Sequence, residues 1–538
     1  MSSINYSITG DKAQHLNTMQ KLGLVLATMA FFIVVMYIST SKILIEPTWL
    51  FFPLMLFGFA AGTAFYTWGT YKGLPAGIKN NGVYFNALTN RGSLAWVLGV
   101  FLTLFYVFLY WYPEYLGLGV GENGTNRGLV ALFDGMSHVF RNKDADQWFV
   151  YGSFYTMAIL FLGIKFIVKY RHNRYHLIRT IVVIFSQLVF AYFLPFILEA
   201  LNANSAGYYS LNPVNFYPLN YSFFTADQVN AMAGDGNQPF GLAYLVWGII
   251  GFLVLTPIIT YYVGKRWYCS WFCGCGGLAE TAGDSFRHLS NKSVKAWKIE
   301  RWLIHSVMVF VFTMTLAVMY TYFLDAEFAL QFAVPNRGAG MVILFSWIGL
   351  GLIALLFLRW KAKGNSRKYL LVGAALFTLI GIVMLINYSI GNHNAFGVSS
   401  YKLKEWYGFY IGAIFSGIIG VGFYPILGNR VWCRFGCPMA GYMGIVQRFK
   451  SRFRITTNGG QCISCGNCST YCEQGIDVRW YAQRGQNIVR ASCVGCGVCS
   501  SVCPRGVLKL ENGPEDGRIN DNPIILGNDM PRMNPNVK

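Results

Sequence analysis

The sequence predicts a mainly α-helical fold, a polytopic bundle of about ten transmembrane helices followed by a small cysteine-rich α+β module. Three observations carry this prediction. The 538 residues are 54% apolar and only 12% charged, whereas soluble domains carry about a quarter charged residues. Apolar runs long enough to cross a bilayer recur along the chain. All 13 cysteines fall between Cys269 and Cys503, and eight of them form two copies of one spacing.

The formal net charge of +20 does not indicate a nucleic-acid partner, because the basic residues lie in loops between apolar runs. Such loop charges act as orientation signals in membrane proteins. The first apolar run, Leu22 to Ile38, has no clear small-residue cleavage site. We therefore expect it to be retained as a membrane anchor and not removed as a signal peptide.

Ten apolar runs set the expected spans and, with the cysteine motifs, the domain boundaries. The spans cover residues 22–41, 48–68, 94–112, 150–169, 177–198, 241–263, 302–323, 341–359, 369–388 and 407–428. We divide the chain into an N-terminal transmembrane region with external loops, a transmembrane region with paired cysteine motifs, the cysteine-rich module, and a flexible Asn-, Pro- and Gly-rich tail. Their boundaries are 1–239, 240–450, 451–512 and 513–538.

Loop charge predicts the orientation of these spans. The loops after the fourth, sixth and eighth spans carry clusters of Lys and Arg, whereas the alternate loops at 199–240 and 325–340 have little excess positive charge. Cytoplasmic loops are the ones enriched in Lys and Arg. The pattern predicts a multi-pass protein of the bacterial cytoplasmic (inner) membrane, with both termini in the cytoplasm. The long external loops, 113–149 and 199–240, are expected to form a folded cap, and a docking surface for an external redox partner is the alternative.

Five cysteines lie at two matching places beside the ends of expected spans. GKRWYCSWFCGCGG follows the sixth span and holds Cys269, Cys273 and Cys275, and GNRVWCRFGCPMAGY follows the tenth and holds Cys433 and Cys437. Cysteines at i and i+4 share one face of a helix, so two such pairs on neighbouring helices would offer four thiolates to one metal site. A single pair would be read as small apolar residues at a helix end, or as independent free thiols, but two matching copies favour a shared site.

Charges near these motifs bear on the proposed site. We expect helix C-termini to bring partial negative charge toward it and neighbouring basic residues to oppose that charge. Those basic residues are Lys265, Arg266, Arg430 and Arg434. Cys275 is a reserve ligand, because Gly274 gives the chain freedom to present it in place of Cys273.

The stretch from Gln461 to Pro504 carries the most specific motif. Cysteines follow C-x2-C-x2-C-x3-C twice, and a proline follows the last one, which is the bacterial two-cluster ferredoxin pattern. In this pattern three cysteines of each run hold one [4Fe–4S] cube, and the fourth holds the other cube. One cube is thus assigned to Cys462, Cys465, Cys468 and Cys503, and the other to Cys493, Cys496, Cys499 and Cys472.

Zinc and disulfides are the competing interpretations of these eight cysteines. Structural zinc prefers two separated C-x2-C pairs and would leave cysteines unused here. Disulfides would need an oxidising compartment, whereas the predicted topology places this module in the cytoplasm. With two cubes in the module, the paired motifs at the span ends would hold a third iron–sulfur cluster, either [4Fe–4S] or [2Fe–2S].

Paired C-x3-C motifs at the ends of membrane spans, followed by a two-cluster ferredoxin module, resemble the membrane-bound polyferredoxin family of the NapH, NosR and CcoG (FixG, RdxA) type. The likeness covers Trp267 to Leu510, roughly the second half of the chain. Cys433, Cys437 and Pro438 match the family motif fully, whereas Gly274 stands where the first copy would have proline and Cys275 is additional. The spans before Phe240 have no counterpart in the resemblance.

The resemblance implies electron transfer along or through the cytoplasmic membrane, from quinol or a cytoplasmic donor to a partner redox protein or respiratory enzyme complex. The alternatives are an assembly or maturation factor for a respiratory enzyme and a redox sensor. Whether the chain is itself an enzyme, for example a quinol-oxidising subunit, stays open, and no catalytic residue is assigned. A bound quinone would need a polar group near the bilayer edge. The candidates are Gln187, Glu199, His305 and Asp325.

Overall fold

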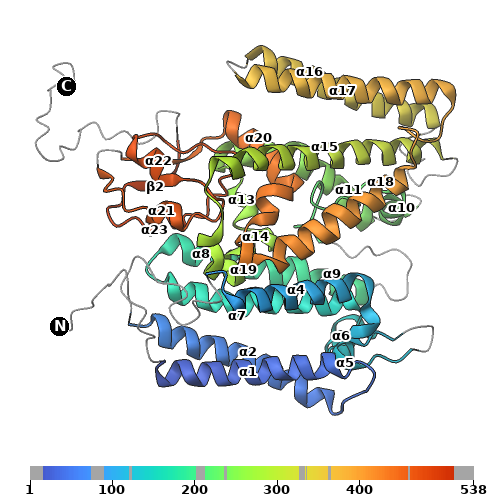
Figure 1. Ribbon diagram of the computed structural model, residues 1–538. Coiled ribbons are helices and arrows are strands. Elements are labelled where there is room, and N and C mark those ends of the chain that lie inside the picture. Colours follow the sequence, from blue (N-terminus) through green and yellow to red (C-terminus); the bar gives the residue numbers. More distant parts are fainter. Residues whose placement is uncertain are drawn as a thin grey trace, which may run out of the picture.

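The computed structural model describes residues 16–73, 90–119, 124–201, 212–234, 239–325, 334, 336–361, 365–458 and 461–513. Nine helices in this described part are long and apolar enough to cross a membrane, and they coincide with the first nine expected spans. The helices run roughly side by side, with the C-terminal module (residues 451–512) at one end of the bundle (Figure 1). The expected tail at 513–538 lies almost wholly outside the described residues.

The first half of the chain forms one side of the bundle, with the α1–α2 hairpin outermost (Figure 1). Its elements are α1 (Thr18–Ser39), α2 (Thr48–Tyr71), α4 (Ser93–Trp111), η1 (Pro113–Leu116), α5 (Gly128–Ala131), α6 (Asp134–Arg141), α7 (Gln147–Lys169), α8 (Arg174–Phe185), η2 (Ser186–Phe193) and α9 (Leu194–Leu201).

The second half forms the centre and the opposite side, where the α16–α17 hairpin is outermost (Figure 1). Its elements before the module are α10 (Ala226–Ala233), α11 (Pro239–Ile250), η4 (Gly251–Leu255), α12 (Thr256–Val263), α13 (Arg266–Cys269), α14 (Gly274–Thr281), η5 (Ala282–Leu289), α15 (Val294–Leu324), α16 (Arg337–Lys361), α17 (Asn365–Ile390), α18 (Ser400–Trp406), η7 (Tyr407–Gly422), α19 (Tyr424–Leu427), η8 (Trp432–Gly436) and α20 (Pro438–Lys450).

Small residues allow α1 and α2 to pack closely. A side chain at Gly23 would meet the backbone nitrogen of Tyr66 at 2.5 Å, and one at Gly62 would meet the backbone of Ala27 at 2.8 Å. Such close backbone approach is the usual basis of helix association in membranes, where apolar burial alone gives little driving force. The α1 helix starts at a capping box, in which Asn17 and Gln20 exchange side-chain and backbone hydrogen bonds of 2.8 Å.

Four helical stretches in the described part of the bundle are π-helical, and a proline follows each of them. The segments are η2, η4, η7 and η8, and the prolines are Pro195, Pro257, Pro425 and Pro438. Proline lacks the backbone N–H and clashes with the preceding turn, so a locally wider helix relieves the conflict. The tenth expected span, 407–428, falls on η7 and α19, and it is not among the nine helices that meet the length and hydropathy criteria.

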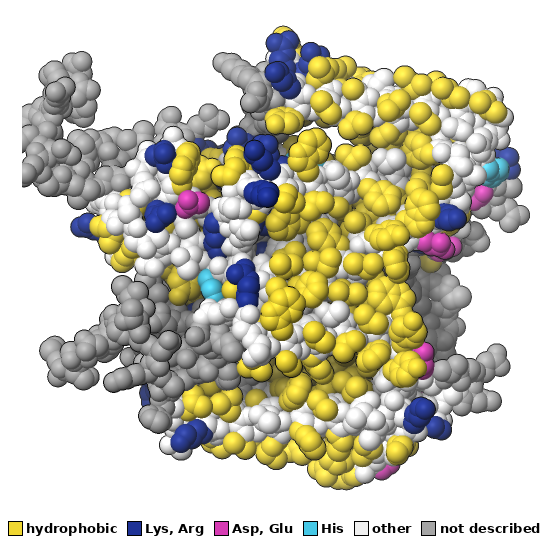
Figure 2. Space-filling model, viewed as in Figure 1, with side chains coloured by type: hydrophobic (Ala, Val, Ile, Leu, Met, Phe, Trp, Pro, Cys, Tyr) yellow, Lys and Arg dark blue, Asp and Glu magenta, His cyan; other side chains and the backbone are white. Residues whose placement is uncertain are grey.

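Hydrophobic side chains cover the middle of the molecular face in Figure 2, whereas Lys and Arg gather beside the C-terminal module. Large apolar residues on outward helix faces remain exposed, for example Phe32, Trp302 and Leu350. A soluble protein rarely exposes such continuous apolar surface. The surface therefore fits a protein surrounded by lipid along the length of its helices.

The C-terminal module is built on a two-stranded antiparallel sheet. Strand β1 (Phe453–Thr457) pairs with β2 (Leu508–Asn512), with Phe453 opposite Asn512. Between the strands lie three short helices, α21 (Asn467–Thr470), α22 (Val478–Gln483) and α23 (Val498–Ser501). The sheet joins the two ends of the module, so both cysteine runs are held over one small core.

Candidate iron–sulfur sites

The two cysteine runs of the C-terminal module have the same backbone path. Gly466 and Gly497, each just before a four-residue helix, have φ angles of +79° and +81°. Ser464 and Gly495, each just before the second cysteine of a run, have φ angles of +59° and +64°. Glycine adopts this left-handed region without strain. The repeated turns wrap the chain around each cysteine set, as the motif spacing predicts.

The first set of cysteines comes together around one small cavity. Cys462, Cys465, Cys468 and Cys503 all line it, although Cys503 belongs to the second run. Burial raises the pKa of the Cys468 thiol to about 12, and the neighbouring Cys503, Cys465 and Cys462 contribute to the rise. The structure thus groups the four residues that the crossed assignment puts on one cube.

The second set is more deeply buried. Burial raises the pKa of Cys499, with Cys496, Cys472 and Cys493 contributing. Burial likewise raises the pKa of Cys493 to about 11, and Cys472 lies close enough to add to it. Cys472 therefore lies with the cysteines of the other run, as the crossed assignment expects.

Four cysteines of the membrane region share one buried cluster. Cys269, Cys273, Cys433 and Cys437 pack together with Tyr268, Trp432 and Met443. Each of these thiols is 5–7% exposed. Two motifs that are about 160 residues apart in sequence therefore meet at one place, because α13 and η8 each contribute a cysteine to the same buried cluster.

The prediction that both cysteines of each C-x3-C pair lie on one face of a helix is wrong. Cys269 ends α13, and Cys273 lies just before the start of α14. Cys433 lies in η8, and Cys437 lies just before the start of α20. Each pair thus bridges a break between two short helices. A continuous helix would separate the thiols along its axis, whereas the break turns both of them toward the same centre.

Helix N-termini face this site in addition to the expected helix C-termini, because α13 and η8 end there and α14 and α20 begin there. The backbone N–H of Ala440, in the first turn of α20, donates to Cys437 Sγ at 3.4 Å. Helix N-termini carry partial positive charge, so they stabilise thiolates. The basic residues that were expected to face this site also differ in what they contact. Arg430 Nη1 contacts Cys433 Sγ at 3.6 Å, but Arg434 Nε turns away to Glu300 at 2.7 Å.

Gly274 and Cys275 differ from the matching positions of the second motif, and the structure gives a reason. A side chain at 274 would come within 2.4 Å of Gln187 Oε1. A hydrogen bond from Cys275 lowers the pKa of Cys273 to about 7, despite its burial. Proline at 274 would displace Gln187. Glycine at this position therefore lets Gln187, which belongs to η2, lie close to the backbone of this half of the site.

The C-terminal module docks directly on the membrane cysteines. Cys496 and Val494 pack against the cluster that contains Cys269 and Cys433. Ser270 Oγ donates to the Val494 carbonyl at 2.8 Å. Gln447 Nε2 on α20 donates to the Cys493 carbonyl, also at 2.8 Å. The second cysteine set is therefore the one that faces the membrane site.

A buried network of ion pairs surrounds this junction, and sequence reasoning did not find it. Glu473 pairs with Arg287 at 2.6 Å and with Arg430 at 3.0 Å. Asp284 pairs with Lys169 at 2.6 Å. All of these side chains are at most 1% exposed. The signal available was the rarity of acidic residues, since an Asp or Glu in so apolar a chain needs a buried partner.

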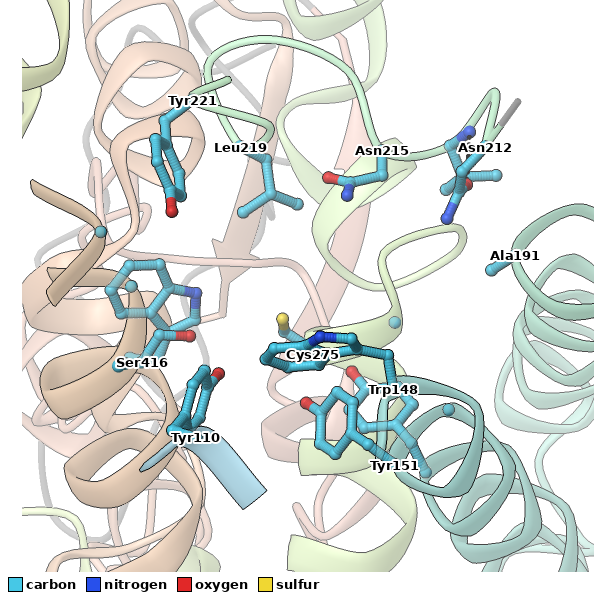
Figure 3. A pocket seen from close by; sticks show the side chains of 18 of the residues that line it. Tyr110, Trp148, Tyr151, Ala191, Asn212, Asn215, Leu219, Tyr221, Cys275 and Ser416 are labelled. Carbon is cyan, nitrogen blue, oxygen red and sulfur yellow. Dashed lines mark hydrogen bonds between the residues drawn. The ribbon is translucent and has the colours of Figure 1, made fainter. Parts of the chain in front are cut away.

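A cavity of about 910 Å³ lies on the other side of the membrane cysteines. Cys275 points into it, and Tyr110, Tyr151 and Tyr221 surround the same space (Figure 3). Nearly half of the lining residues are aromatic, and the cavity extends to Trp148, at the start of α7. The α8 helix, which follows the end of α7, contacts the module through Tyr175. The cavity therefore extends from the cysteine cluster toward the end of the bundle away from the module.

Two polar atoms at the cavity wall lack partners among the described residues. They are Nε1 of Trp432 and Oδ1 of Asn215. Of the four polar candidates for a quinone site, Gln187 lines this cavity. Glu199 instead pairs with Lys143, and the His305 side chain is exposed and contacts the Arg301 carbonyl. Asp325 directly follows the last residue of α15.

The donor sets fit iron–sulfur clusters. All 13 cysteines are free thiols, and they gather as three sets, two in the module and one in the membrane region. Within the part of the chain that the structure describes, no three His, Cys, Asp or Glu side chains are arranged to hold a single metal ion. In a cube each thiolate binds a different iron, so its ligands stand farther apart than around one zinc ion.

Fold and sites together define a mainly helical protein, with helices able to span a membrane, that carries ferredoxin-type 4Fe–4S domains. Residues 454–504 match the 4Fe-4S dicluster domain, and residues 245–295 and 408–456 each match the 4Fe-4S binding domain. The latter two segments contain the paired motifs at Cys269 and Cys433.

One curated protein is similar to part of the chain. It is the "Putative electron transport protein YccM" of Escherichia coli (strain K12), 24% identical over 231 residues. The alignment covers 43% of this chain and 46% of that protein, so the chain matches about half of its relative's length. No solved structure matches the chain.

Proposed function

We propose that this chain relays electrons at the cytoplasmic membrane, between a cytoplasmic donor or the quinone pool and a partner redox enzyme, as in the NapH, NosR and CcoG type of polyferredoxin. The observation that carries the proposal is the packing of Cys496, from the module, against the buried cluster of Cys269 and Cys433. An electron path needs closely spaced sites, and this junction brings a module site and a membrane site into contact.

The cysteine sets would hold three clusters in a row. Cys462, Cys465, Cys468 and Cys503 would bind the outer one, since Cys465 is exposed. Cys493, Cys496, Cys499 and Cys472 would bind the middle one, and Cys269, Cys273, Cys433 and Cys437 the inner one. Such clusters gain and lose single electrons. The protein's share is to bury the inner sites, fix their spacing and supply the amide and guanidinium groups that set their potentials.

Loop charge supports an orientation in which the module and both termini face the cytoplasm. The similarity to an electron transport protein, over the part of each chain that the alignment covers, also supports electron transfer as the function.

Membrane vesicles of defined sidedness test the relay. Inverted vesicles that contain this chain should pass electrons from external dithionite to trapped ferricyanide at least tenfold faster than vesicles with Cys496→Ser. The serine variant interrupts the middle site, so the outer site can still be reduced without onward transfer. Right-side-out vesicles should show no such difference, because the module then faces inward. Equal rates with wild-type and variant chains in inverted vesicles would contradict the relay.

The aromatic cavity is the site that we propose for a bound quinone. A volume of about 910 Å³ lies at the upper end of the range for small-molecule sites. The indole N–H of Trp432 and the amide of Gln187 would hydrogen-bond the two oxygens of a headgroup, and the tyrosine rings would flank its plane. Among the lining residues, the one Lys and the one Glu are adjacent in sequence, Lys404 and Glu405. This surface suits a neutral ligand better than a phosphorylated cofactor.

Filling the cavity should weaken quinone binding. Gly152 on α7 lines the cavity, and a Cβ atom added there would have no other atom within 4 Å. Gly152→Leu should weaken binding of a short-tailed quinone analogue at least tenfold, measured by quenching of tryptophan fluorescence. Gly349→Leu is the matched control, because Gly349 also lies within a membrane helix with open space around it, outside the cavity lining. Equal affinities in the two variants, or no saturable binding by the wild type, would contradict a quinone site here.

A further inference from the structure

Glu280 occupies the point where the middle and inner sites meet. It lies on α14 and is 3% exposed. One carboxylate oxygen accepts from Arg430 Nη2 at 2.6 Å, and the other pairs with Arg179 Nη2 at 2.5 Å. A single carboxylate thus bridges two arginines that come from different elements, α8 and the segment before η8.

Each of these arginines also touches one cysteine site. Arg430 Nη1 donates to Cys433 Sγ at 3.6 Å and to the Cys269 carbonyl at 3.2 Å. Arg179 Nη1 donates to the Cys496 carbonyl. The chain of contacts therefore runs from the inner site through Arg430, Glu280 and Arg179 to the middle site, without an exposed group along it.

We propose that Glu280 is a positioning residue that sets the reduction potentials of the middle and inner sites together. This inference rests on the proposed function, because it requires a redox centre at each site. Each one-electron reduction adds one negative charge to a buried centre. Charges interact strongly where the surroundings are poorly polarisable, so the fixed negative charge of Glu280 opposes reduction at both sites. It also holds the two guanidinium groups against their cysteines.

The sign of the effect follows from this arrangement. Glu280→Gln keeps the size of the side chain and removes its charge, so the positive arginines are left less balanced. Both sites then become easier to reduce, and their potentials rise. The outer site, at Cys462, has no contact with this bridge among the described residues and should change least.

Redox titrations of the purified full-length protein, followed by electron paramagnetic resonance, test the proposal. In Glu280→Gln the reduction equilibria of the middle and inner centres should each shift at least tenfold, which is about 59 mV for one electron. The outer centre should shift less than twofold. Glu280→Asp, which retains the charge, should stay within threefold of the wild type at both centres.

Glu300→Gln is the control that distinguishes an effect on reduction potential from a purely structural role of the carboxylate. Glu300 is also buried and pairs with an arginine, Arg434, at 2.7 Å, but that arginine's other hydrogen bond among the described residues goes to the Asn291 carbonyl. Glu300→Gln should lower thermal stability as much as Glu280→Gln does, with little change in potential. Unchanged potentials in Glu280→Gln, or equal shifts in the two variants, would overturn the inference. Absence of an inner centre in the wild type would instead refute the proposed function, and the iron content reports that outcome separately.

Discussion

Replacing Cys433 with serine should lower the iron content of anaerobically purified protein from about 10 to 12 atoms per chain to about eight. The expected loss reflects removal of one of the four thiolates that are buried together at this site. The two centres of the C-terminal module should keep their electron paramagnetic resonance signals, because Cys433 lies outside both module sets. Iron analysis together with these spectra measures the effect.

The matched control for this experiment is Cys275→Ser. Cys275 lies beside Cys273 but points into the aromatic cavity (Figure 3). The control should therefore keep its full iron content. Iron loss in Cys275→Ser, with full iron content in Cys273→Ser, would show that Cys275 is the ligand in place of Cys273. A wild-type value of about eight irons per chain would show that the inner site binds no cluster.

Replacing Cys472 with serine should damage the centre held by Cys493, Cys496 and Cys499, although Cys472 is nearer in sequence to the other one. The physical reason is the turn after α21, which leaves Cys472 close to Cys493 and Cys499. The measurement is electron paramagnetic resonance of the reduced protein, with the middle centre expected to lose its signal.

Cys468→Ser is the counterpart, since Cys468 lines the outer cavity. It should abolish the outer signal and leave the middle one. Selective loss of the outer signal in Cys472→Ser would contradict the crossed assignment.

The sequence carried enough information for the helices and the module. Long apolar runs can satisfy their backbone groups in a membrane only as helices, so nine expected spans appear as helices. Their bounds agree with the predicted ones within about four residues, except that α15 begins at Val294, eight residues before the expected start at 302. The tenth became π-helical because closely spaced glycines within η7, and Pro425 just after it, disturb regular helix geometry. Apolar periodicity does not report such local widening.

Sequence by itself determined which cysteines belong to the C-terminal module, because cluster ligands within one short motif are fixed by spacing along the chain. It also indicated that Cys269 and Cys433 act in one place. Only the tertiary structure decided how these thiols are presented, at breaks between short helices and facing helix N-termini. It likewise brought Glu280, Arg179 and Arg430 together and formed the aromatic cavity beside Cys275. Glu280 is 101 residues from Arg179 and 150 residues from Arg430 in sequence. Such contacts depend on how whole helices pack, which no local pattern of residues records.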